Sequence, residues 1–239
     1  MLYNKTTKIK LILSLIFTAL VLMLDISQIF AKPLRFADSV NWTTIKQIEM
    51  SLKGTPPMNV GFDIDDTSLF TKSSHYLMRE KHCPNDTNVY HDKCSASQDY
   101  WDDLSQLDYM NPPKETAKLL IEMHKKRGDK IYFITARESP TKKQEKTTSH
   151  LKKTFKINKM PPVIFVGLEA FDPKLPSKAI VLKKKNIKIY YGDADSDILA
   201  AQKADTRPIR VMRASNSQDN KAMPINGRFG EEVIIDSDV

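Results

Sequence analysis

Short, nearly continuous apolar runs alternate with segments of helical periodicity along most of the chain. The apolar runs, which predict strands, lie at 58–64, 130–135, 163–166, 187–191 and 209–212. The segments with apolar positions three and four apart predict helices at about 41–52, 113–127, 141–155, 177–185 and 195–204. Strands that are apolar on both faces are typical of a parallel sheet with helices on both sides. We therefore expect an α/β fold with a doubly wound parallel sheet.

The alternation breaks down between about 71 and 112, where the chain is polar and has no clear period. This segment carries both cysteines and a short aromatic and acidic run at 100–104. A long irregular insertion straight after a strand that ends in acids is more often a lid than a linker. We expect a small lid insertion at about 71–112, and a disordered surface loop is the alternative.

The first 31 residues have the features of a secretory signal peptide. Three lysines precede an uncharged, mostly apolar run at 11–24, and Ala31 offers a cleavage site. A retained membrane anchor is the alternative, but the run is shorter than the roughly 20 residues that a spanning helix needs. We expect residues 1–31 to be removed, which leaves 32–239 as one secreted domain that is not attached to a membrane.

Cys83 and Cys94 are the only cysteines of the chain. The oxidising compartment that a secreted protein meets favours a disulfide between them, which would stabilise the fold by about 3 kcal/mol through its effect on the unfolded chain. The alternatives are two free thiols, or a zinc site with His82 and His91. Structural zinc sites usually contain a tighter Cys-x-x-Cys type of unit, which this chain lacks.

The formal net charge is +8 at pH 7, and a basic surface favours anionic small molecules. Lysines cluster at 142–143, 152–153 and 183–185, on or beside predicted helices. They lack the interleaved aromatic residues of a nucleic-acid platform. We interpret them as solvated helix faces and expect small-molecule partners and no nucleic-acid polymer.

Acidic residues follow two of the predicted strands. Asp63 and Asp65 stand at the end of the strand at 58–64, and Asp193 and Asp197 follow the strand at 187–191. Two carboxylates on one face of a strand repel each other unless a cation lies between them. Because the ends of parallel strands meet at one edge of a sheet, these acids predict a divalent metal site.

A hydroxyl and two cations accompany the acids. Thr135 ends the strand at 130–135, Arg137 lies beyond it, and Lys178 opens a helix. A phosphoryl group in transfer spreads negative charge over its oxygens, which a metal ion, a lysine and hydroxyl or N–H donors neutralise. This combination indicates phosphate chemistry.

The acids can divide this chemistry among themselves. Mg²⁺ prefers a few carboxylates, which Asp63 and Asp193 can supply. One carboxylate can attack phosphorus and a second can protonate the leaving oxygen and then activate water, and Asp63 and Asp65 fit those two tasks. Taken singly, Asp65, Lys178 and Asp197 could also be a turn acid, a surface lysine and a helix-start acid.

The residues carry a family resemblance. Asp63-Ile64-Asp65-Asp66-Thr67 resembles the DxDxT motif of the haloacid dehalogenase superfamily of phosphohydrolases, and Thr135, Lys178 and the segment 192–197 resemble its second, third and fourth motifs. A closer resemblance, to the bacterial class B acid phosphatases, runs from about residue 40 to the C-terminus and weakens between 71 and 112. Longer segments carry it, among them 62–67, 162–165, 191–193, 213–217 and 229–234.

This resemblance implies a periplasmic, Mg²⁺-dependent phosphomonoesterase that is commonly a homotetramer. Such enzymes hydrolyse nucleotides and aryl phosphates at mildly acidic pH through an aspartyl-phosphate, and can transfer phosphate to alcohols. A narrower 5′-nucleotidase or phosphotransferase on the same site is one alternative. A non-catalytic secreted storage or binding protein is another, which the intact Asp63 disfavours.

The motifs also imply a role for each residue. Asp63 is the nucleophile and a metal ligand, Asp65 is the acid/base and binds the metal through its backbone carbonyl, and Asp193 completes the metal site. The remaining assignments are substrate contacts for Thr135, Ala136 and Lys178 and supporting roles for Arg137 and Asp197.

Two features depart from the family pattern. Ala136 stands where the family usually has glycine, and its methyl group could crowd the phosphate loop or remove a positive-φ option. We expect altered substrate preference rather than loss of activity. The segment at 71–112 is also atypical, and Tyr76, Tyr100 and Trp101 are candidates to stack on a substrate ring.

Overall fold

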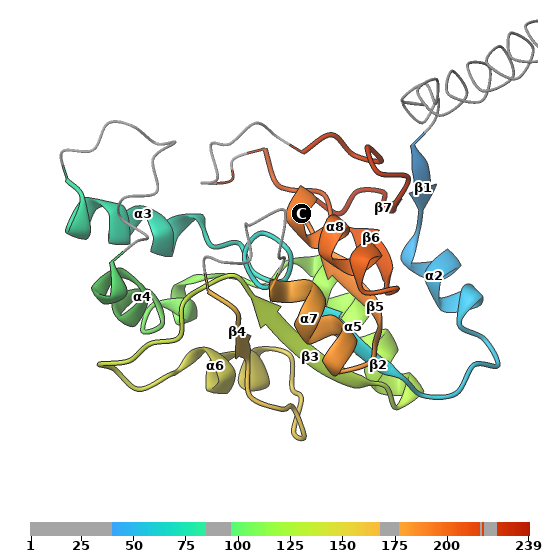
Figure 1. Cartoon of the computed structure of the whole chain (residues 1–239), viewed down its shortest axis with the longest axis horizontal. Coiled ribbons are helices and arrows are strands. Elements are labelled where there is room, and N and C mark those ends of the chain that lie inside the picture. The colour runs from blue at the N-terminus through green and yellow to red at the C-terminus, as the bar shows by residue number, and fades with distance from the viewer. Residues whose placement is uncertain (1–39, 85–96, 168–176, 216, 218–223) are drawn as a thin grey trace, which may run out of the picture. The chain divides into compact units, whose positions relative to one another are not determined.

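The apolar runs form one parallel sheet. Its strands are β1 (Asn41–Thr43), β2 (Asn59–Phe62), β3 (Lys130–Thr135), β4 (Ile164–Phe165), β5 (Ile187–Gly192), β6 (Arg207–Arg210) and β7 (Glu232–Ile234). The computed structural model describes residues 40–84, 97–167, 177–215, 217 and 224–239. Within these ranges the sheet has seven strands in the order β1-β7-β6-β5-β2-β3-β4 (Figure 1), and all neighbours pair in parallel.

The chain runs outward from β2 in both directions, through β3 and β4 on one side and through β5, β6 and β7 on the other. The doubly wound α/β class predicted from the sequence is confirmed. The strand order reverses between β2 and β5, and in such sheets ligands bind beyond the carboxyl ends of the strands at that point. The backbone N–H of Asp63 still donates to the carbonyl of Tyr191 (2.9 Å), so β5 fixes the first residue beyond β2.

Helices cover both faces of the sheet. One layer is formed by α2 (Ile45–Ser51), α5 (Glu115–Arg127) and α6 (Thr147–Thr154), and its apolar residues pack on Phe62 and Phe133. The other layer is formed by α7 (Ser177–Lys184) and α8 (Asp195–Lys203), on the near side in Figure 1, and packs on Tyr132 and Tyr190. Successive residues of β3 thus serve opposite layers, as the alternation of side chains along a strand requires.

The predicted helix at 41–52 begins later than expected. Residues 41–43 form β1, and a capping box at Thr44 starts α2. Gln47 N–H donates to Thr44 Oγ1 (3.1 Å), and Thr44 N–H donates to Gln47 Oε1 (2.8 Å). The sequence analysis also missed β7, which pairs with β1, because strands of three residues are too short to show a period.

The prediction that 71–112 is irregular is wrong for its described part. It contains α3 (Lys72–His82), α4 (Gln98–Leu104) and the short 3₁₀ helix η1 (Asp108–Met110). Only a narrow apolar face holds α3 and α4 together, with Met78 packed among Tyr100, Trp101 and Leu104, so the helical period is weak in the sequence. The lid itself stays a prediction.

Two expectations for this segment have different outcomes. Tyr100 and Trp101 are buried between the helices and Tyr76 is 52% exposed, so the first two act as core residues of the insertion.

Cys83 follows α3 directly, but Cys94 and His91 lie outside the described residues. The disulfide and the zinc alternative therefore stay predictions.

The helix predicted at 141–155 starts only at Thr147. The preceding loop is instead held by the buried Asp102 of α4, whose carboxylate accepts the N–H groups of Thr141 (2.6 Å) and Lys142 (3.0 Å). Since this loop follows β3 and Arg137, α4 fixes the chain just beyond the end of β3.

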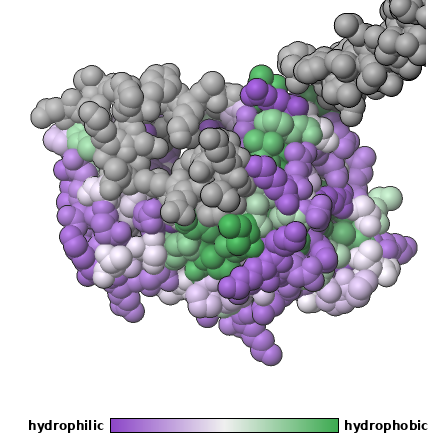
Figure 2. All heavy atoms as spheres, in the orientation of Figure 1, coloured by the Kyte–Doolittle hydropathy of each residue, from purple (hydrophilic) through white to green (hydrophobic). Residues whose placement is uncertain are grey.

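The lysine-rich stretches face solvent as expected. Five of these lysines are exposed, namely Lys142, Lys143, Lys153, Lys183 and Lys184, whereas Lys152 and Lys185 are half-buried. Hydrophilic residues cover most of the described part of the face drawn in Figure 2. Within the described residues, no helix is long and apolar enough to cross a membrane. The expected signal peptide at 1–31 lies outside them.

His124 of α5 gives the core a predictable dependence on pH. Its Nδ1 lies 2.7 Å from Asp129 Oδ2 and its Nε2 lies 2.9 Å from Tyr191 Oη, with no exposed side-chain surface. Burial lowers the pKa of His124, and this outweighs the opposing effect of Asp129. The folded protein therefore keeps the ring neutral at a pH where the unfolded chain, with a histidine pKa of about 6.5, takes up a proton.

We expect the free energy of unfolding to decrease as the pH falls through about 6.5, because only the unfolded state binds this proton. His124→Gln removes the titrating ring, so its stability should fall less between about pH 7.5 and about pH 5.5. Urea unfolding of both proteins at the two pH values measures the difference. The same pH dependence in both proteins would contradict the assignment.

Candidate active site

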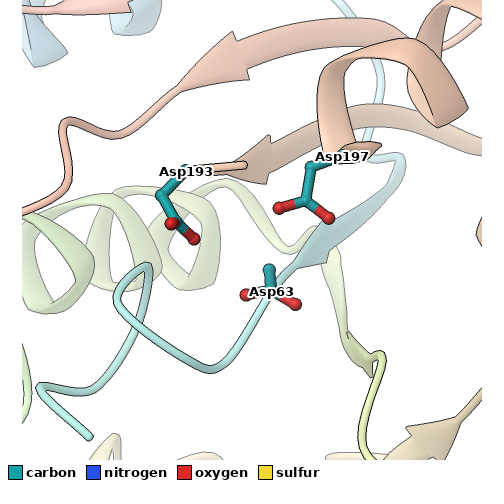
Figure 3. A group of neighbouring side chains, drawn as sticks. All are labelled: Asp63, Asp193 and Asp197. Carbon is teal, nitrogen blue, oxygen red and sulfur yellow. The ribbon is translucent and has the colours of Figure 1, made fainter. Parts of the chain in front are cut away.

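Three carboxylates converge beyond the carboxyl ends of β2 and β5 (Figure 3). Asp63 follows β2, Asp193 follows β5, and Asp197 lies in the first turn of α8. Each offers an oxygen within 4.8 Å of the others, and all three residues are buried. Carboxylates buried this closely need cations to compensate their charge, and their oxygens suit a hard divalent metal ion.

The buried Lys178 supplies part of that compensation. Its Nζ donates to Asp63 Oδ1 (2.6 Å) and to Asp197 Oδ1 (2.5 Å). Burial alone would lower the pKa of Lys178, but Asp197 and Asp63 outweigh it and raise the pKa well above its usual value. The ammonium group is therefore charged, and it links Asp63, at the end of β2, to Asp197 of α8.

Burial raises the pKa of Asp63 well above its usual range; Lys178 opposes this shift, and Asp197 and Asp193 add to it. Burial also raises the pKa of Asp193, against the opposing effect of Arg213. A further cation among these groups would lower both pKa values, because it favours the charged form of each carboxyl group. The cluster is thus electrostatically suited to bind a metal ion.

Asp193 is held by partners on both of its oxygens. Thr67 Oγ1 donates to Oδ1 (2.8 Å), and Arg213 Nε donates to Oδ2 (2.6 Å). The fully buried Arg210 donates to the backbone carbonyl of Asp193 (2.8 Å) and is paired with Glu231 (2.5 Å). The motif residue Thr67 thus orients a carboxylate from a distant strand.

Sequence reasoning missed Arg210, Arg213 and Lys114. Lys114 is fully buried, and its Nζ donates to the backbone carbonyls of Asp66 (3.2 Å) and Met212 (2.7 Å). The two arginines stand within and just after the apolar stretch 209–212, and a cation in such a run is a usable signal because charged residues are almost never fully buried unless paired. Lys114 offered no comparable signal.

The absence of a side chain at Gly192 allows α8 to begin close to the end of β5. A Cβ atom at this position would come within 2.7 Å of the carboxyl carbon of Asp197. Glycine therefore lets α8 begin close against the end of β5, which brings Asp197 into the cluster.

Asp65 lies in a different environment from Asp63. Its carboxylate is 29% exposed and is bound by Arg137, with Nε 2.9 Å from Oδ2 and Nη2 2.8 Å from Oδ1. His75 Nε2 lies 3.1 Å from Oδ1. Burial would raise the pKa of Asp65, but Arg137 and His75 outweigh it and hold the pKa well below its usual range. Asp65 is thus an ionised carboxylate outside the three-acid cluster.

Arg137 itself is anchored by the insertion. Its Nη1 contacts both oxygens of the buried Asp108 of η1 (2.9 and 3.2 Å), and Thr147 Oγ1 donates to the same carboxylate (2.5 Å). The sequence analysis gave Arg137 a supporting role but did not identify Asp108 as its partner.

Thr135 and Ala136 lie at the end of β3, next to β2 in the sheet. Thr135 is buried, and its Oγ1 accepts the N–H of Arg137 (3.2 Å). Ala136 does not have a positive φ, in contrast to Asp66 (φ 56°). The backbone therefore accommodates alanine here without the strain that a positive φ would cause.

This combination of a doubly wound sheet and four motif positions beyond the carboxyl ends of its strands defines a phosphatase of the haloacid dehalogenase superfamily, whose members use a divalent metal. Residues 37–221 match the family described as HAD superfamily, subfamily IIIB (Acid phosphatase). The chain belongs to this family, the class B acid phosphatases.

Individual proteins agree with this assignment. The class B acid phosphatase of Edwardsiella ictaluri is 43% identical over 202 residues, which are 83% of this chain and 79% of that protein. The class B acid phosphatase of Rahnella sp. is 44% identical over 203 residues, 83% of this chain and 81% of that protein. The crystal structure of CbbY from Rhodobacter sphaeroides in complex with phosphate shares the fold, with a TM-score of 0.52 and 13% identity over 75% of this chain and 93% of that one.

The buried ion pairs of Lys178 can be tested by their effect on stability. Lys178→Met keeps the length of the side chain but leaves Asp63 and Asp197 without their shared cation. Because removing one partner of a buried pair leaves uncompensated charge, we expect the metal-free protein to lose about 3–5 kcal/mol of unfolding free energy. Urea unfolding in the presence of a chelator measures this loss.

Lys183→Met on the same helix is the matched control. Lys183 is exposed, and a surface substitution of this kind changes stability by less than about 0.5 kcal/mol. Equal losses in the two variants would show that Lys178 does not compensate the buried carboxylates.

Proposed function

We propose that this chain is a secreted, Mg²⁺-dependent acid phosphatase that hydrolyses phosphomonoesters, nucleotides and aryl phosphates among them, and can pass the phosphoryl group to alcohols. The observation that carries the proposal is the meeting of Asp63, Asp193 and Asp197 at the switch point of the sheet, where Lys178 is bound to Asp63 and Asp197. The family assignment supports the reaction class.

The residues of the cluster fit a magnesium ion. Three buried carboxyl groups provide oxygen ligands. Burial raises the pKa of Asp63 and of Asp193, and a bound cation would favour the charged form of both. Asp63 and Asp193 would hold the ion together with the backbone carbonyl of Asp65, while Asp197, bound to Lys178, supports them. When bound, Mg²⁺ neutralises charge on the phosphoryl oxygens.

The protein groups carry out two displacements. Asp65, which is ionised in the free protein, first takes up a proton from water. Asp63 then attacks phosphorus, so that an Asp63 O–P bond forms while the P–O bond to the leaving group breaks and Asp65 gives that proton to the departing oxygen. Water then attacks the aspartyl-phosphate while Asp65 takes a proton from it, which restores Asp63 and releases phosphate. The ionised state of Asp65 suits this second step. An alcohol in place of water gives phosphotransfer.

Other side chains bind the phosphoryl group. Lys178 lies beside the nucleophile at 2.6 Å and can contact a phosphoryl oxygen from there. Thr135 supplies a hydroxyl from the end of β3, and Ala136 continues the same loop. A periplasmic location and a homotetramer belong to the same proposal and rest on the features of residues 1–31 and on the family resemblance.

Asp63→Asn tests the nucleophile. Because an amide cannot form the aspartyl-phosphate, we expect kcat on p-nitrophenyl phosphate to fall by on the order of 10³-fold or more. Asp205→Asn is the control, since Asp205 is exposed and already has a positive φ (54°), a backbone conformation that asparagine tolerates. Retention of activity in Asp63→Asn, or an inactive wild type, would refute the mechanism.

Mg²⁺ binding is expected to stabilise the folded protein. At about 100 times its dissociation constant, a ligand that binds only the folded state adds about 2.7 kcal/mol, so Mg²⁺ should raise Tm relative to chelator. Asp193→Asn should abolish this shift. Scanning calorimetry with Mg²⁺ and with chelator provides the measurement, and an Asp193→Asn variant that keeps the full shift would place the ion elsewhere.

A further inference from the structure

His75 of α3 lies between Asp65 and Tyr100. Its Nε2 lies 3.1 Å from Asp65 Oδ1, and its Nδ1 lies 2.7 Å from the hydroxyl of Tyr100. Both His75 and Tyr100 come from the segment at 71–112, outside all four motifs. Thus α3 contacts the side chain of Asp65 through His75, and α4 supports His75 through Tyr100.

For a neutral imidazole ring, the chemistry of the partners fixes the direction of both hydrogen bonds. Arg137 donates to both carboxylate oxygens of Asp65, which therefore act as acceptors. The proton of a neutral His75 ring is then on Nε2 and points to Asp65 Oδ1. Nδ1 is then an acceptor, and the Tyr100 hydroxyl donates to it. The hydrogen bond that Nδ1 accepts therefore favours the tautomer with the proton on Nε2.

Packing holds the imidazole ring in place. The Tyr100 ring centroid lies 6.1 Å from that of His75, and the Trp101 ring meets His75 edge-on at 6.4 Å with an interplanar angle of 85°. Tyr100 and Trp101 are buried in the contact between α3 and α4. The direction of the Nε2–H bond is therefore determined by the core of the insertion.

The contacts make the two oxygens of Asp65 unequal. Oδ1 accepts from His75 and from Arg137 Nη2 (2.8 Å), whereas Oδ2 accepts only from Arg137 Nε (2.9 Å) among the described residues. A carboxylate oxygen has two acceptor positions, so Oδ1 is fully used and Oδ2 keeps one position open. Oδ2 is the oxygen left to carry a proton.

We propose that His75, supported by Tyr100, is a positioning residue that fixes Asp65 so that Oδ2 exchanges the proton of the reaction. Oδ2 takes up a proton from water before the first displacement. In that displacement the Oδ2–H bond breaks and an O–H bond forms on the leaving oxygen, while the bond between the leaving oxygen and phosphorus breaks and the Asp63 O–P bond forms. This inference rests on the acid/base role proposed for Asp65.

Two substrates whose leaving groups differ in their need for a proton can distinguish the positioning of Asp65 from a general structural effect of the substitution. An alkyl phosphate requires protonation of its leaving oxygen, and p-nitrophenyl phosphate hardly does. Well-placed general acids contribute about 10²–10⁴-fold. We expect His75→Phe to lower kcat/KM about tenfold or more on 2-glycerophosphate and less than about threefold on p-nitrophenyl phosphate. The ratio kcat/KM reports substrate binding and the first displacement, and excludes the later hydrolysis of the aspartyl-phosphate.

Three further variants sharpen the test. His75→Gln keeps an N–H donor and should recover part of the loss on 2-glycerophosphate. Tyr100→Phe removes only the hydroxyl and should show the same selectivity with a smaller loss, which keeps the inference testable if His75→Phe folds poorly. Glu80→Gln, at an exposed position of the same helix as His75, should leave activity on both substrates unaffected.

The tautomer gives a readout independent of activity. Nitrogen-15 correlation spectra of the neutral His75 ring should show the proton on Nε2, and a proton on Nδ1 would overturn the inference. So would equal losses on the two substrates in His75→Phe and Tyr100→Phe. If these results occur while Asp63→Asn is inactive, only the role of His75 fails; if wild type hydrolyses neither substrate, the proposed function fails with it.

Discussion

The site depends on the compensation of buried negative charge. Three carboxylates from two strand ends and a helix meet within 4.8 Å, which is tolerable only because Lys178 bridges Asp63 and Asp197 and Arg213 holds Asp193. The fold serves this arrangement: β2 and β5 are neighbours, and Gly192 lets α8 start against the sheet. Such a cluster binds a metal ion and an anionic substrate well because both relieve its remaining imbalance.

The two acids of the first motif, although two residues apart, have opposite environments. Burial raises the pKa of Asp63, whereas Arg137 and His75 lower that of Asp65 against the effect of burial. Environments that push the pKa values of neighbouring carboxyl groups apart are the usual way in which one site gives the two groups different tasks. Here the sheet determines the environment of Asp63, and the insertion, through His75, Tyr100 and Asp108, determines that of Asp65.

The sequence was sufficient where the pattern repeats. Continuous apolar strands predicted the doubly wound sheet, and the motif spacing predicted that Asp63, Lys178 and Asp193 meet, because the ends of parallel strands share an edge. The sequence was insufficient where a contact depends on one particular pair of residues and not on a repeating pattern. The helices α3 and α4 bury too narrow a face to show a period, and Asp108 or His75 can be recognised only once folding brings them to Arg137 and Asp65. Asp197, which was expected to support the metal site, lies with Asp63 and Asp193 in the carboxylate cluster.

The account requires that phosphate from the substrate is transiently bonded to Asp63. The most direct test is rapid acid quenching of the enzyme during turnover of an aryl phosphate, followed by reduction of acyl phosphates with borohydride and mass spectrometry of the peptides. The account predicts that Asp63, and no other residue, is converted to homoserine, and that Asp63→Asn gives no conversion. Conversion at another carboxylate, or phosphate bound stably to a histidine or serine, would contradict it.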